Sequence, residues 1–381
     1  MHIALVTETY PPEVNGVAMT LSRLVAGLRA RGHIVALVRP RQPEEAEPAA
    51  GPDELLVPGL PLPFYRALRI GRPQVGRLRE HWRRRRPDVV HIATEGPLGW
   101  AALRAARQLA LPVTSSFHTN FHAYGGHYGL RLLRRPGLAY LRWFHNRTRC
   151  TLVPAGDLRD RLAAEGFERL DVLARGVDTA LYAPERRNAA LRASWGAGER
   201  DPVVVYVGRI APEKNLGLAV EAFLAMRAVE PAARFVLVGD GPGRAGLARQ
   251  YPDFHYAGMR RGADLAAHYA SADVAVFPSL TETFGNVVTE GLASGLVVLT
   301  YDYAAGREHV RDGVNGFAAP FGDAGAFLAR ARGVMDRRGA WPQWRAAARA
   351  TALDLTWDAI VERFEGQVSS AAGVQPRACA G

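Results

Sequence analysis

The chain has 381 residues, which is too many for one ordinary hydrophobic core and suits two domains. It is 48% hydrophobic and 22% charged, no apolar run is long enough to span a membrane, and the N-terminus lacks the pattern of a signal peptide. The net charge of +11 is uneven, because residues 1–180 carry 26 basic and 16 acidic side chains and residues 181–381 carry 22 and 21. The two cysteines are far apart, so we expect no disulfide framework, no cysteine metal site and a cytoplasmic location.

The first half of the chain alternates short apolar runs with helical patterns. Residues 3–6 predict a strand, residues 17–31 a helix, and residues 33–38 the next strand. Residues 41–53 are rich in Pro, Glu and Ala and predict a surface loop. Four further strands are expected at residues 88–92, 112–117, 150–153 and 171–173.

The second half repeats this alternation. Residues 203–207 and 235–238 predict strands that end in glycine turns, and a helix follows Asn215. Three further strands are expected at residues 254–256, 274–277 and 297–300. Residues 179–201 predict a linker and residues 341–364 a terminal helical region, and we expect the last dozen or so residues to be disordered.

This pattern is typical of parallel sheets with crossover helices, here in two copies. The expected fold class is α/β, with two Rossmann-like doubly wound domains that face each other across a cleft. We place an N-terminal domain at residues 1–180, a C-terminal ligand-binding domain at residues 181–365 and a tail at residues 366–381. The terminal helical region is a candidate to pack back on the N-terminal domain. Ligands of such sheets bind beyond the carboxyl ends of the strands, so functional residues should directly follow strands.

Two cationic residues are expected at the carboxyl end of the second sheet. Arg209 directly follows a strand, and Lys214 starts the next helix. Lys214 is the one lysine among 48 Lys and Arg residues, which indicates that a compact ammonium is needed there. Two cations beside a helix N-terminus can bind a diphosphate and neutralise a leaving group as its charge develops. The alternative is an ordinary salt bridge from Lys214 to Glu213 or Glu221.

Residues 278–290 follow another strand and carry two acids, Glu282 and Glu290. Residues 283–286 predict the first helical turn, whose backbone N–H groups can bind sugar hydroxyls or phosphate oxygens. Glu290 is expected about two turns into this helix, and eight helical positions amount to an offset of about 80°, so both acids could face one ligand. A helix-capping Glu282 and a solvated Glu290 are the alternatives.

Two loops of the first domain also follow strands. His118 is placed to reach into the cleft as a contacting or orienting side chain, with a buried structural histidine as the alternative. Its spacing from His122 is compatible with metal binding on a helix, but no carboxylate or cysteine completes a site. Gly16 opens a helix and allows a phosphate to approach the backbone closely. No G-x-G-x-x-G follows the first strand, which argues against a dinucleotide-dependent dehydrogenase, and no G-x-x-x-x-G-K-[ST] phosphate loop occurs.

Basic clusters occur near aromatic residues of the first domain. They lie at residues 83–86 and at Arg131, Arg134 and Arg135, close in sequence to Trp82 and Trp143. One interpretation is contact with an anionic membrane surface or an anionic acceptor, and the other is a set of solvated helix ends. Together with the apolar residues 60–65, the clusters favour a lipid or membrane-bound acceptor. Nucleic acid is disfavoured, because no nucleic-acid-binding motif accompanies the charge.

These motifs resemble those of retaining glycosyltransferases of family 4, which have the GT-B fold of two facing Rossmann-like domains. The resemblance covers nearly the whole chain, from residues 15–17 to residues 312–317. Its most specific part is the pair Glu282 and Glu290, with seven residues between them. The mild departure is Gly291 directly after the second acid, where many relatives have alanine or methionine.

Residues 117–121, with Tyr124 and Tyr128, look like the branch of GDP-mannose-dependent α-mannosyltransferases, and the plant sulfolipid synthases are similar here. The resemblance implies transfer of a hexosyl group with retention, mannose from GDP-mannose being expected, to a lipid-linked or saccharide acceptor. It implies no cofactor and no metal requirement. The alternatives are a glycolipid glycosyltransferase that uses a UDP-sugar and, in another class, a sugar-nucleotide epimerase or a non-catalytic sugar-nucleotide-binding protein.

The resemblance also implies roles for single residues. Arg209 and Lys214 would hold the diphosphate. Glu282 would contact the hydroxyls of the donor sugar, Glu290 would bind the ribose, and His118 would contact the sugar. The other implied donor contacts are Gly16 to the phosphate, the backbone of Phe284, Gly285 and Asn286 to the sugar, and Met259 and Arg260 near the base. The expected catalytic set is therefore His118, Arg209, Lys214 and Glu282.

Overall fold

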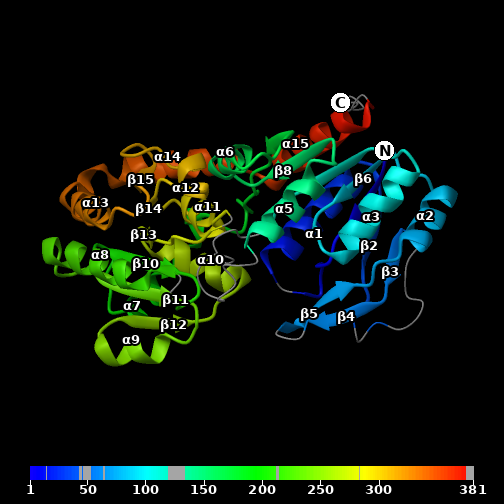
Figure 1. Cartoon of the computed structure of the whole chain (residues 1–381). Coiled ribbons are helices and arrows are strands. Elements are labelled where there is room, and N and C mark those ends of the chain that lie inside the picture. The colour runs from blue at the N-terminus through cyan, green and yellow to red at the C-terminus, as the bar shows by residue number, and fades with distance from the viewer. Residues whose placement is uncertain are drawn as a thin grey trace. The chain divides into compact units, whose positions relative to one another are not determined.

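The computed structural model describes residues 1–13, 15–42, 45, 53–62, 65–118, 134–211, 214–282 and 284–374. The chain divides into two compact units, and Figure 1 shows the order of their elements along the chain. Unit 1 comprises Met1–Arg175 and Trp357–Gly381, and unit 2 comprises Gly176–Thr356. The chain thus leaves unit 1 at Arg175, slightly before the expected residue 180, and returns to it at Trp357.

Unit 1 is built on a parallel sheet with the strand order β3-β2-β1-β6-β7-β8-β9. Its strands are β1 (His2–Val6), β2 (Ile34–Pro40), β3 (Glu54–Val57), β6 (Val89–Ile92), β7 (Val113–Ser116), β8 (Cys150–Val153) and β9 (Leu170–Val172). The register of β1 on β2 runs from His2 opposite Ile34 to Val6 opposite Val38. A separate antiparallel pair, β4 (Gly59–Leu62) and β5 (Tyr65–Gly71), occupies the segment that the sequence marks as apolar.

Side-chain alternation along β1 explains how helices cover both faces of this sheet. Ala4 and Val6 belong to a hydrophobic cluster with α2, α3 and α5, whereas Ile3 and Leu5 belong to another with α1 and α15. The helices in the described residues of unit 1 are α1 (Gly16–Ala30), α2 (Val75–Arg84), α3 (Pro97–Gln108), α5 (Arg134–His145), α6 (Gly156–Ala164) and α15 (Trp357–Ala372).

Helix α15 corrects the expectation for the end of the chain. The sequence predicts a tail from residue 366 and disorder over the last dozen or so residues. The helix instead continues to Ala372, and Val368 and Ser369 are fully buried. The expected tail is therefore wrong for residues 366–372, which form part of a packed helix. The small, polar residues of this segment suggest a tail. Its apolar residues nevertheless continue the helical spacing of the buried side of α15.

Unit 2 is built on a second parallel sheet, with the strand order β12-β11-β10-β13-β14-β15. Its strands are β10 (Val203–Val207), β11 (Arg234–Val238), β12 (His255–Gly258), β13 (Val274–Phe277), β14 (Val297–Tyr301) and β15 (Gly316–Ala319). Its α-helices are α7 (Ala189–Ser194), α8 (Leu216–Val229), α9 (Arg244–Gln250), α10 (Gly262–Ser271), α11 (Asn286–Ala293), α12 (Ala305–His309), α13 (Ala324–Asp336) and α14 (Trp341–Leu353). Short 3-10 turns lie at Pro184–Arg186 and Arg338–Ala340. The α/β class with two Rossmann-like units is thus confirmed.

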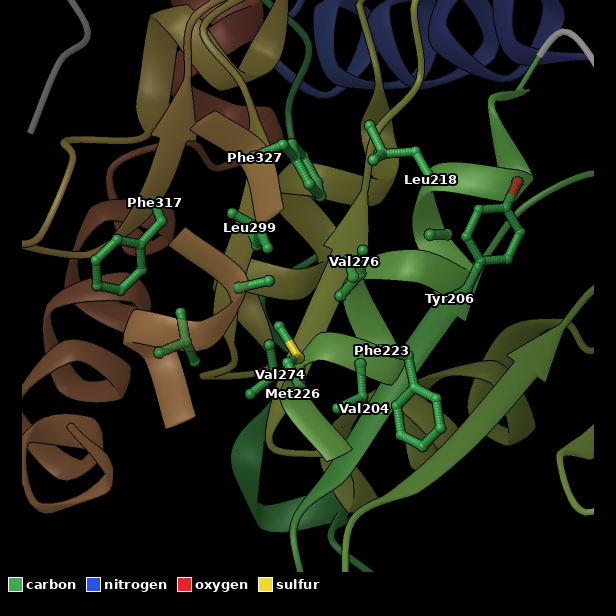
Figure 2. Packing of buried hydrophobic residues seen from close by; sticks show 14 of the residues in the cluster. Val204, Tyr206, Leu218, Phe223, Met226, Val274, Val276, Leu299, Phe317 and Phe327 are labelled. Atoms are coloured by element: carbon green, nitrogen blue, oxygen red, sulfur yellow. The ribbon is translucent and has the colours of Figure 1, made fainter. Parts of the chain in front are cut away.

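One hydrophobic cluster packs helices of unit 2 against its sheet, and Figure 2 shows it from close by. Val204 and Tyr206 of β10 and Val276 of β13 project into the same core. Phe223 of α8 stacks on Phe235 of β11 with ring centroids 4.7 Å apart. Because β10 and β13 are also hydrogen-bonded neighbours, the core fixes the positions at which the loops after both strands begin.

The loops after β10 and β11 approach each other backbone to backbone. A Cβ added to Gly239, whose φ is 141°, would lie 1.9 Å from the carbonyl oxygen of Gly208. The N–H of Ile210 also donates to the carbonyl of Asp240 at 2.9 Å. Only glycine permits this approach, which holds the backbone that carries Arg209.

Residues 179–201, predicted to be a linker, are an ordered part of unit 2, so that prediction is wrong. The segment is anchored on Asp273, whose side chain is 7% exposed and lies just before β13. This carboxylate accepts hydrogen bonds from Arg187 at 3.0 Å, Arg192 at 3.2 Å and Arg345 at 3.3 Å, and from the N–H of Val203 at 2.9 Å. We call the side chains of Asp273, Arg187, Arg192 and Arg345 the Asp273 cluster. Two arginines of the expected linker, Arg187 and Arg192, therefore bind one buried acid.

Candidate functional site

Each sheet reverses its strand order at one point. In unit 2 the chain moves from β10 to β11 and β12 on one side, and then returns to β13 on the other side of β10. In unit 1 the corresponding reversal point lies between the neighbouring strands β1 and β6. Ligands of doubly wound sheets bind beyond the carboxyl ends of the strands at such points. The structure therefore directs attention to the residues that follow β10 and β13, and to those that follow β1 and β6.

Lys214 and Glu282 form an ion pair at the reversal point of unit 2. Lys214 follows β10 and Glu282 follows β13, and their side chains are 22% and 16% exposed. Ser279 Oγ donates a hydrogen bond of 2.8 Å to the same Glu282 Oε1 that contacts the ammonium. Asn215, which has a left-handed φ of 54°, donates to the carbonyl of Pro278 at 3.2 Å. The two loops are thereby linked, and two predicted site residues are brought together.

This pairing bears on the alternative of an ordinary salt bridge. Among the described residues, Lys214 forms its ion pair with Glu282, the other predicted catalytic residue, and not with Glu221. Glu213 lies outside the described residues. Because both groups remain partly exposed, an incoming phosphate could compete for the Lys214 ammonium. Glu282 would then accept hydrogen bonds from hydroxyl groups of the ligand, while the hydrogen bond from Ser279 keeps its carboxylate oriented.

Glu290 of α11 is held by two tyrosines. Tyr269 Oη donates a hydrogen bond of 2.9 Å to Glu290 Oε2, and Tyr182 also donates to this carboxylate. The two tyrosine rings meet edge to face with centroids 5.7 Å apart. Burial raises the pKa of Glu290 to about 7, although the tyrosine hydrogen bonds act to lower it. A carboxyl group that titrates near neutrality beside a reversal point is a feature of functional sites.

The start of α11 differs from the prediction. The helix begins at Asn286, and Gly285, with φ 96°, is its N-terminal cap. Glu282 therefore precedes the helix, and Glu290 lies about one turn inside it rather than two. The helical offset of about 80° between the two acids does not apply, because Glu282 lies before the helix. Asn286 Oδ1 is covered and has no hydrogen-bond partner in the described part of the chain, so it can receive a donor from a ligand.

The other predicted donor contacts of unit 2 are less closely gathered. The side chain of Arg209 is exposed, and its carbonyl accepts a hydrogen bond of 3.0 Å from Tyr206 Oη. Phe284 has a buried ring, and its carbonyl accepts a hydrogen bond of 2.8 Å from the N–H of Ala305. Met259 is 60% exposed after the edge strand β12, and Arg260 binds Asp264 at 3.1 Å. No described contact links this edge to the Lys214–Glu282 pair.

In unit 1, Gly16 begins α1 at the carboxyl end of the sheet. Asn15 caps this helix, accepting hydrogen bonds from the N–H groups of Val17 at 3.1 Å and Ala18 at 2.9 Å. A Cβ added to Gly16 would lie 3.2 Å from Arg175 Nη1, so a larger residue would crowd that guanidinium. Arg175, which follows β9, was not singled out in the sequence, although its position directly after a strand is the signal that marks the other candidates.

His118 follows β7 and also lies near Arg175. Both ring nitrogens are covered and have no hydrogen-bond partner among the residues that the structure describes. Burial, together with the nearby charge of Arg175, lowers the pKa of His118 to about 3. The imidazole is therefore neutral at neutral pH. A structural role would satisfy at least one nitrogen, so the unpaired ring favours a contact with a ligand.

Glu8 is a second residue that the sequence patterns did not single out. It follows β1 at the reversal point of unit 1, and its carboxylate accepts hydrogen bonds from the N–H groups of Leu98 at 2.8 Å and Gly71. Burial, together with the nearby Glu13 and Glu95, raises its pKa to about 7, although the two backbone hydrogen bonds act to lower it. Both carboxylate oxygens are engaged by backbone, so Glu8 positions the start of α3 and the end of β5 beside the site.

Several predicted features fall outside the described residues. They are residues 119–121 of the branch motif, Tyr124, Tyr128, Arg131 and the second histidine of the considered metal pair, His122. Across the described ranges, no three His, Cys, Asp or Glu side chains gather as metal ligands would.

Helices α2, α3 and α5 share one hydrophobic cluster and present a strongly basic outer side, here called the cationic face. Their sequences contain nine arginines and one glutamate. On α5, Tyr140 and Trp143 are each 37% exposed with centroids 6.0 Å apart, and Arg147 lies 4.4 Å from the Trp143 ring. Trp82 is only 1% exposed, so it belongs to the core and its expected role beside the lipid is wrong.

Two family models match the chain. Residues 14–181 match Glycosyltransferase Family 4, and residues 201–337 match Glycosyl transferases group 1. The two matches fall on unit 1 and unit 2 respectively, apart from a few residues at their common boundary.

Curated relatives match over nearly the whole chain. A GDP-mannose-dependent alpha-mannosyltransferase of Mycobacterium tuberculosis is 34% identical, covering 98% of this chain and 97% of the relative. One of the same description from Mycolicibacterium smegmatis is 35% identical, covering 98% of each. A sulfoquinovosyl transferase of Arabidopsis thaliana is 29% identical, covering 97% of this chain and 74% of the relative.

Solved structures share the fold. The Anabaena protein HepE in complex with UDP has a TM-score of 0.75 at 18% identity, covering 97% of this chain and 100% of that one. Sucrose-phosphate synthase from Thermosynechococcus elongatus has a TM-score of 0.74 at 19% identity, covering 97% and 98%. At these identities the likeness shows the fold alone, which is the GT-B architecture of two Rossmann-like domains.

Proposed function

The chain belongs to glycosyltransferase family 4, and we propose that it transfers mannose from GDP-mannose to a lipid-linked or saccharide acceptor with retention of configuration. The observation that carries this proposal is the Lys214–Glu282 pair at the reversal point of unit 2. It is supported by the relatives that are described as GDP-mannose-dependent and match both units.

The proposed chemistry uses groups that the chain itself supplies. Lys214 and Arg209 bind the diphosphate and stabilise the charge that develops as the bond from the sugar C1 to the phosphate oxygen breaks. The acceptor oxygen forms the new bond to C1 on the same face, and its proton passes to the leaving diphosphate. Glu282 and the N-terminus of α11 hold the sugar hydroxyls, and the neutral His118 contacts the sugar. The proposed reaction needs neither a cofactor nor a metal ion.

The donor is tested by thermal stability in the presence of nucleotide sugars, because a ligand that binds the native state raises the apparent stability. We expect GDP-mannose and GDP to raise Tm more than UDP-glucose and UDP do. A larger shift with the uridine nucleotides would replace the proposed donor by a UDP-sugar. An absence of shift with every nucleotide would contradict sugar-nucleotide binding altogether.

The pKa of Glu290 predicts how donor binding changes with pH. Its carboxylate is the form that accepts hydrogen bonds from the ribose hydroxyls in this proposal, and the pKa of about 7 means that this form is lost as the pH falls through neutrality. The KM for the donor should therefore rise as the pH is lowered through about 7. In Glu290→Gln the KM should be high and nearly independent of pH in this range. A wild-type KM that stays constant would show that Glu290 does not bind the donor as the anion.

The cationic face supports the proposal that the enzyme works in the cytoplasm on an acceptor at an anionic membrane surface. None of the described helices is long and apolar enough to cross a bilayer. Arginines clustered beside exposed aromatic side chains attract anionic lipids, and the aromatic rings suit the interface between headgroups and water.

We expect the protein to bind anionic vesicles at low salt and to leave them as salt is raised. Each arginine near the surface contributes about 1 kcal/mol, so Arg107→Glu/Arg135→Glu should weaken vesicle binding at least about tenfold. Both side chains are exposed on the cationic face. Arg332→Glu, an exposed site on α13 of unit 2, is the matched control. Binding is measured by vesicle flotation. If the wild type, Arg107→Glu/Arg135→Glu and Arg332→Glu bind equally well, the cationic face is not the membrane-binding surface.

A further inference from the structure

A cavity of about 940 Å³ lies in unit 1 at the amino ends of β8 and β9. Its walls come from the turn after α5, the starts of the two strands and the last turns of α15. Strands β7, β8 and β9 run parallel, and His118 follows the carboxyl end of β7. The cavity is therefore at the opposite edge of the unit 1 sheet from His118 and Gly16, and no step of the proposed reaction uses it.

The lining is rich in arginine. Arg147, Arg149, Arg169 and Arg363 line the cavity together with a single carboxylate, Asp171. In the described part of the chain, Arg169 pairs with Glu168 at 2.8 Å, and the other three guanidinium groups have no carboxylate partner. Positive charge gathered in a concave surface focuses the field on an anion that enters it.

Two of these arginines are held in place by contacts that leave donors unused. Arg149 Nη1 donates to the carbonyl of Ala371 at 2.7 Å, and Arg147 lies 4.4 Å from the centroid of the Trp143 ring. A guanidinium has five N–H donors, so each group retains others for a ligand. Groups that are already ordered lose less entropy when they bind.

Gln367 supplies an independent indication of a ligand. Its Nε2 donates to Asp171 Oδ2 at 2.7 Å and to the carbonyl of Val172 at 3.2 Å. These two acceptors fix the orientation of the amide, because the reverse orientation would place oxygen against oxygen. Gln367 Oε1 is then left covered and without a donor among the described residues. A buried acceptor of this kind lacks a hydroxyl or N–H partner.

We propose that this cavity binds a small phosphate-bearing, hydroxyl-rich ligand, with the phosphate on the arginines and a hydroxyl group on Gln367 Oε1. Sugar phosphates have this chemistry, and so do the headgroups of some phospholipids. The ligand would join α15 to the starts of β8 and β9 and so stabilise unit 1.

The test uses the full-length protein with GDP in excess, so that phosphate sites of the donor region are occupied, and calorimetric titration with glucose 6-phosphate. We expect glucose 6-phosphate to bind, glucose to show no binding, and Arg147→Gln/Arg363→Gln to weaken binding about tenfold or more. Arg332→Gln, far from the cavity in sequence and part of unit 2, should bind as the wild type does. Arg363→Gln alone keeps the test valid if the double variant is unstable, because Arg363 has no described side-chain contact to lose.

A second arm identifies the source of the phosphate. Vesicles containing phosphatidylglycerol are offered to the Arg107→Glu/Arg135→Glu protein with and without Arg363→Gln, because Arg147 also belongs to the cationic face. Binding that depends on Arg363 only in the vesicle arm assigns the site to a lipid headgroup, and dependence only in the soluble arm assigns it to a free sugar phosphate. If neither ligand binds, or if the cavity substitutions change neither, the proposal is overturned. Because GDP binding is measured separately, that outcome would leave the proposed transferase activity untouched.

Discussion

Replacing Lys214 by alanine should lower kcat by about a hundredfold to a thousandfold, the usual effect of removing one preorganised group that stabilises developing charge. The ammonium is the cation that the structure places against Glu282 at the reversal point, and it is partly exposed rather than part of the core. The loss should therefore appear in turnover, with Tm nearly unchanged. Initial rates with saturating GDP-mannose, together with a thermal melt of the same sample, measure both quantities.

Two further substitutions make this result specific. Lys214→Arg keeps the charge but replaces a compact ammonium by a planar fork, so it should recover only part of the rate. Arg227→Ala removes a cation of unit 2 that pairs with the exposed Asp253, and it should leave kcat as in the wild type. Full activity of Lys214→Ala would refute the assignment of the diphosphate site.

Replacing Asp273 by asparagine should destabilise the protein by about 3–5 kcal/mol, the range found when one partner of a buried ion pair is removed. The carboxylate is 7% exposed and receives hydrogen bonds from three guanidinium groups, of which Arg192 is itself 3% exposed. Without the negative charge, these cations would face one another in a poorly solvated space. Urea denaturation followed by circular dichroism gives the difference in the free energy of unfolding.

The control for this prediction is Asp264→Asn. Asp264 is 51% exposed and pairs with Arg260, which is 41% exposed and lies just before α10, so the substitution should change the free energy of unfolding by less than about 1 kcal/mol. Equal effects of the two substitutions would show that the Asp273 cluster is no more than a set of surface contacts.

The strands followed from apolar runs because a parallel sheet buried on both faces demands such runs. Residues 203–207 and 274–277 match β10 and β13 in both bounds. The strands that were not predicted lack that signal. Strand β15, Gly316–Ala319, is short and built from small residues, and its place in the sheet comes from pairing with β14.

The site could be predicted as a set of residues but not as a set of contacts. Lys214 and Glu282 stood out because each follows a strand, yet their ion pair depends on β10 and β13 being neighbours, which strand order decides. The two tyrosines on Glu290 could not be predicted, because Tyr182 lies in a segment that looks like a linker and Tyr269 on a helix before β13. They show that Glu290 is a buried, hydrogen-bonded acid, which excludes the alternative of a solvated glutamate.

The central claim is tested most directly by incubating the protein with GDP-mannose and a lipid acceptor, and determining the product and its anomeric configuration by NMR. We expect release of GDP, an α-mannosyl product and retention of the configuration of the donor. A β-linked product would contradict retention. Conversion of GDP-mannose to another sugar nucleotide without any acceptor would identify an epimerase and contradict the proposed transfer.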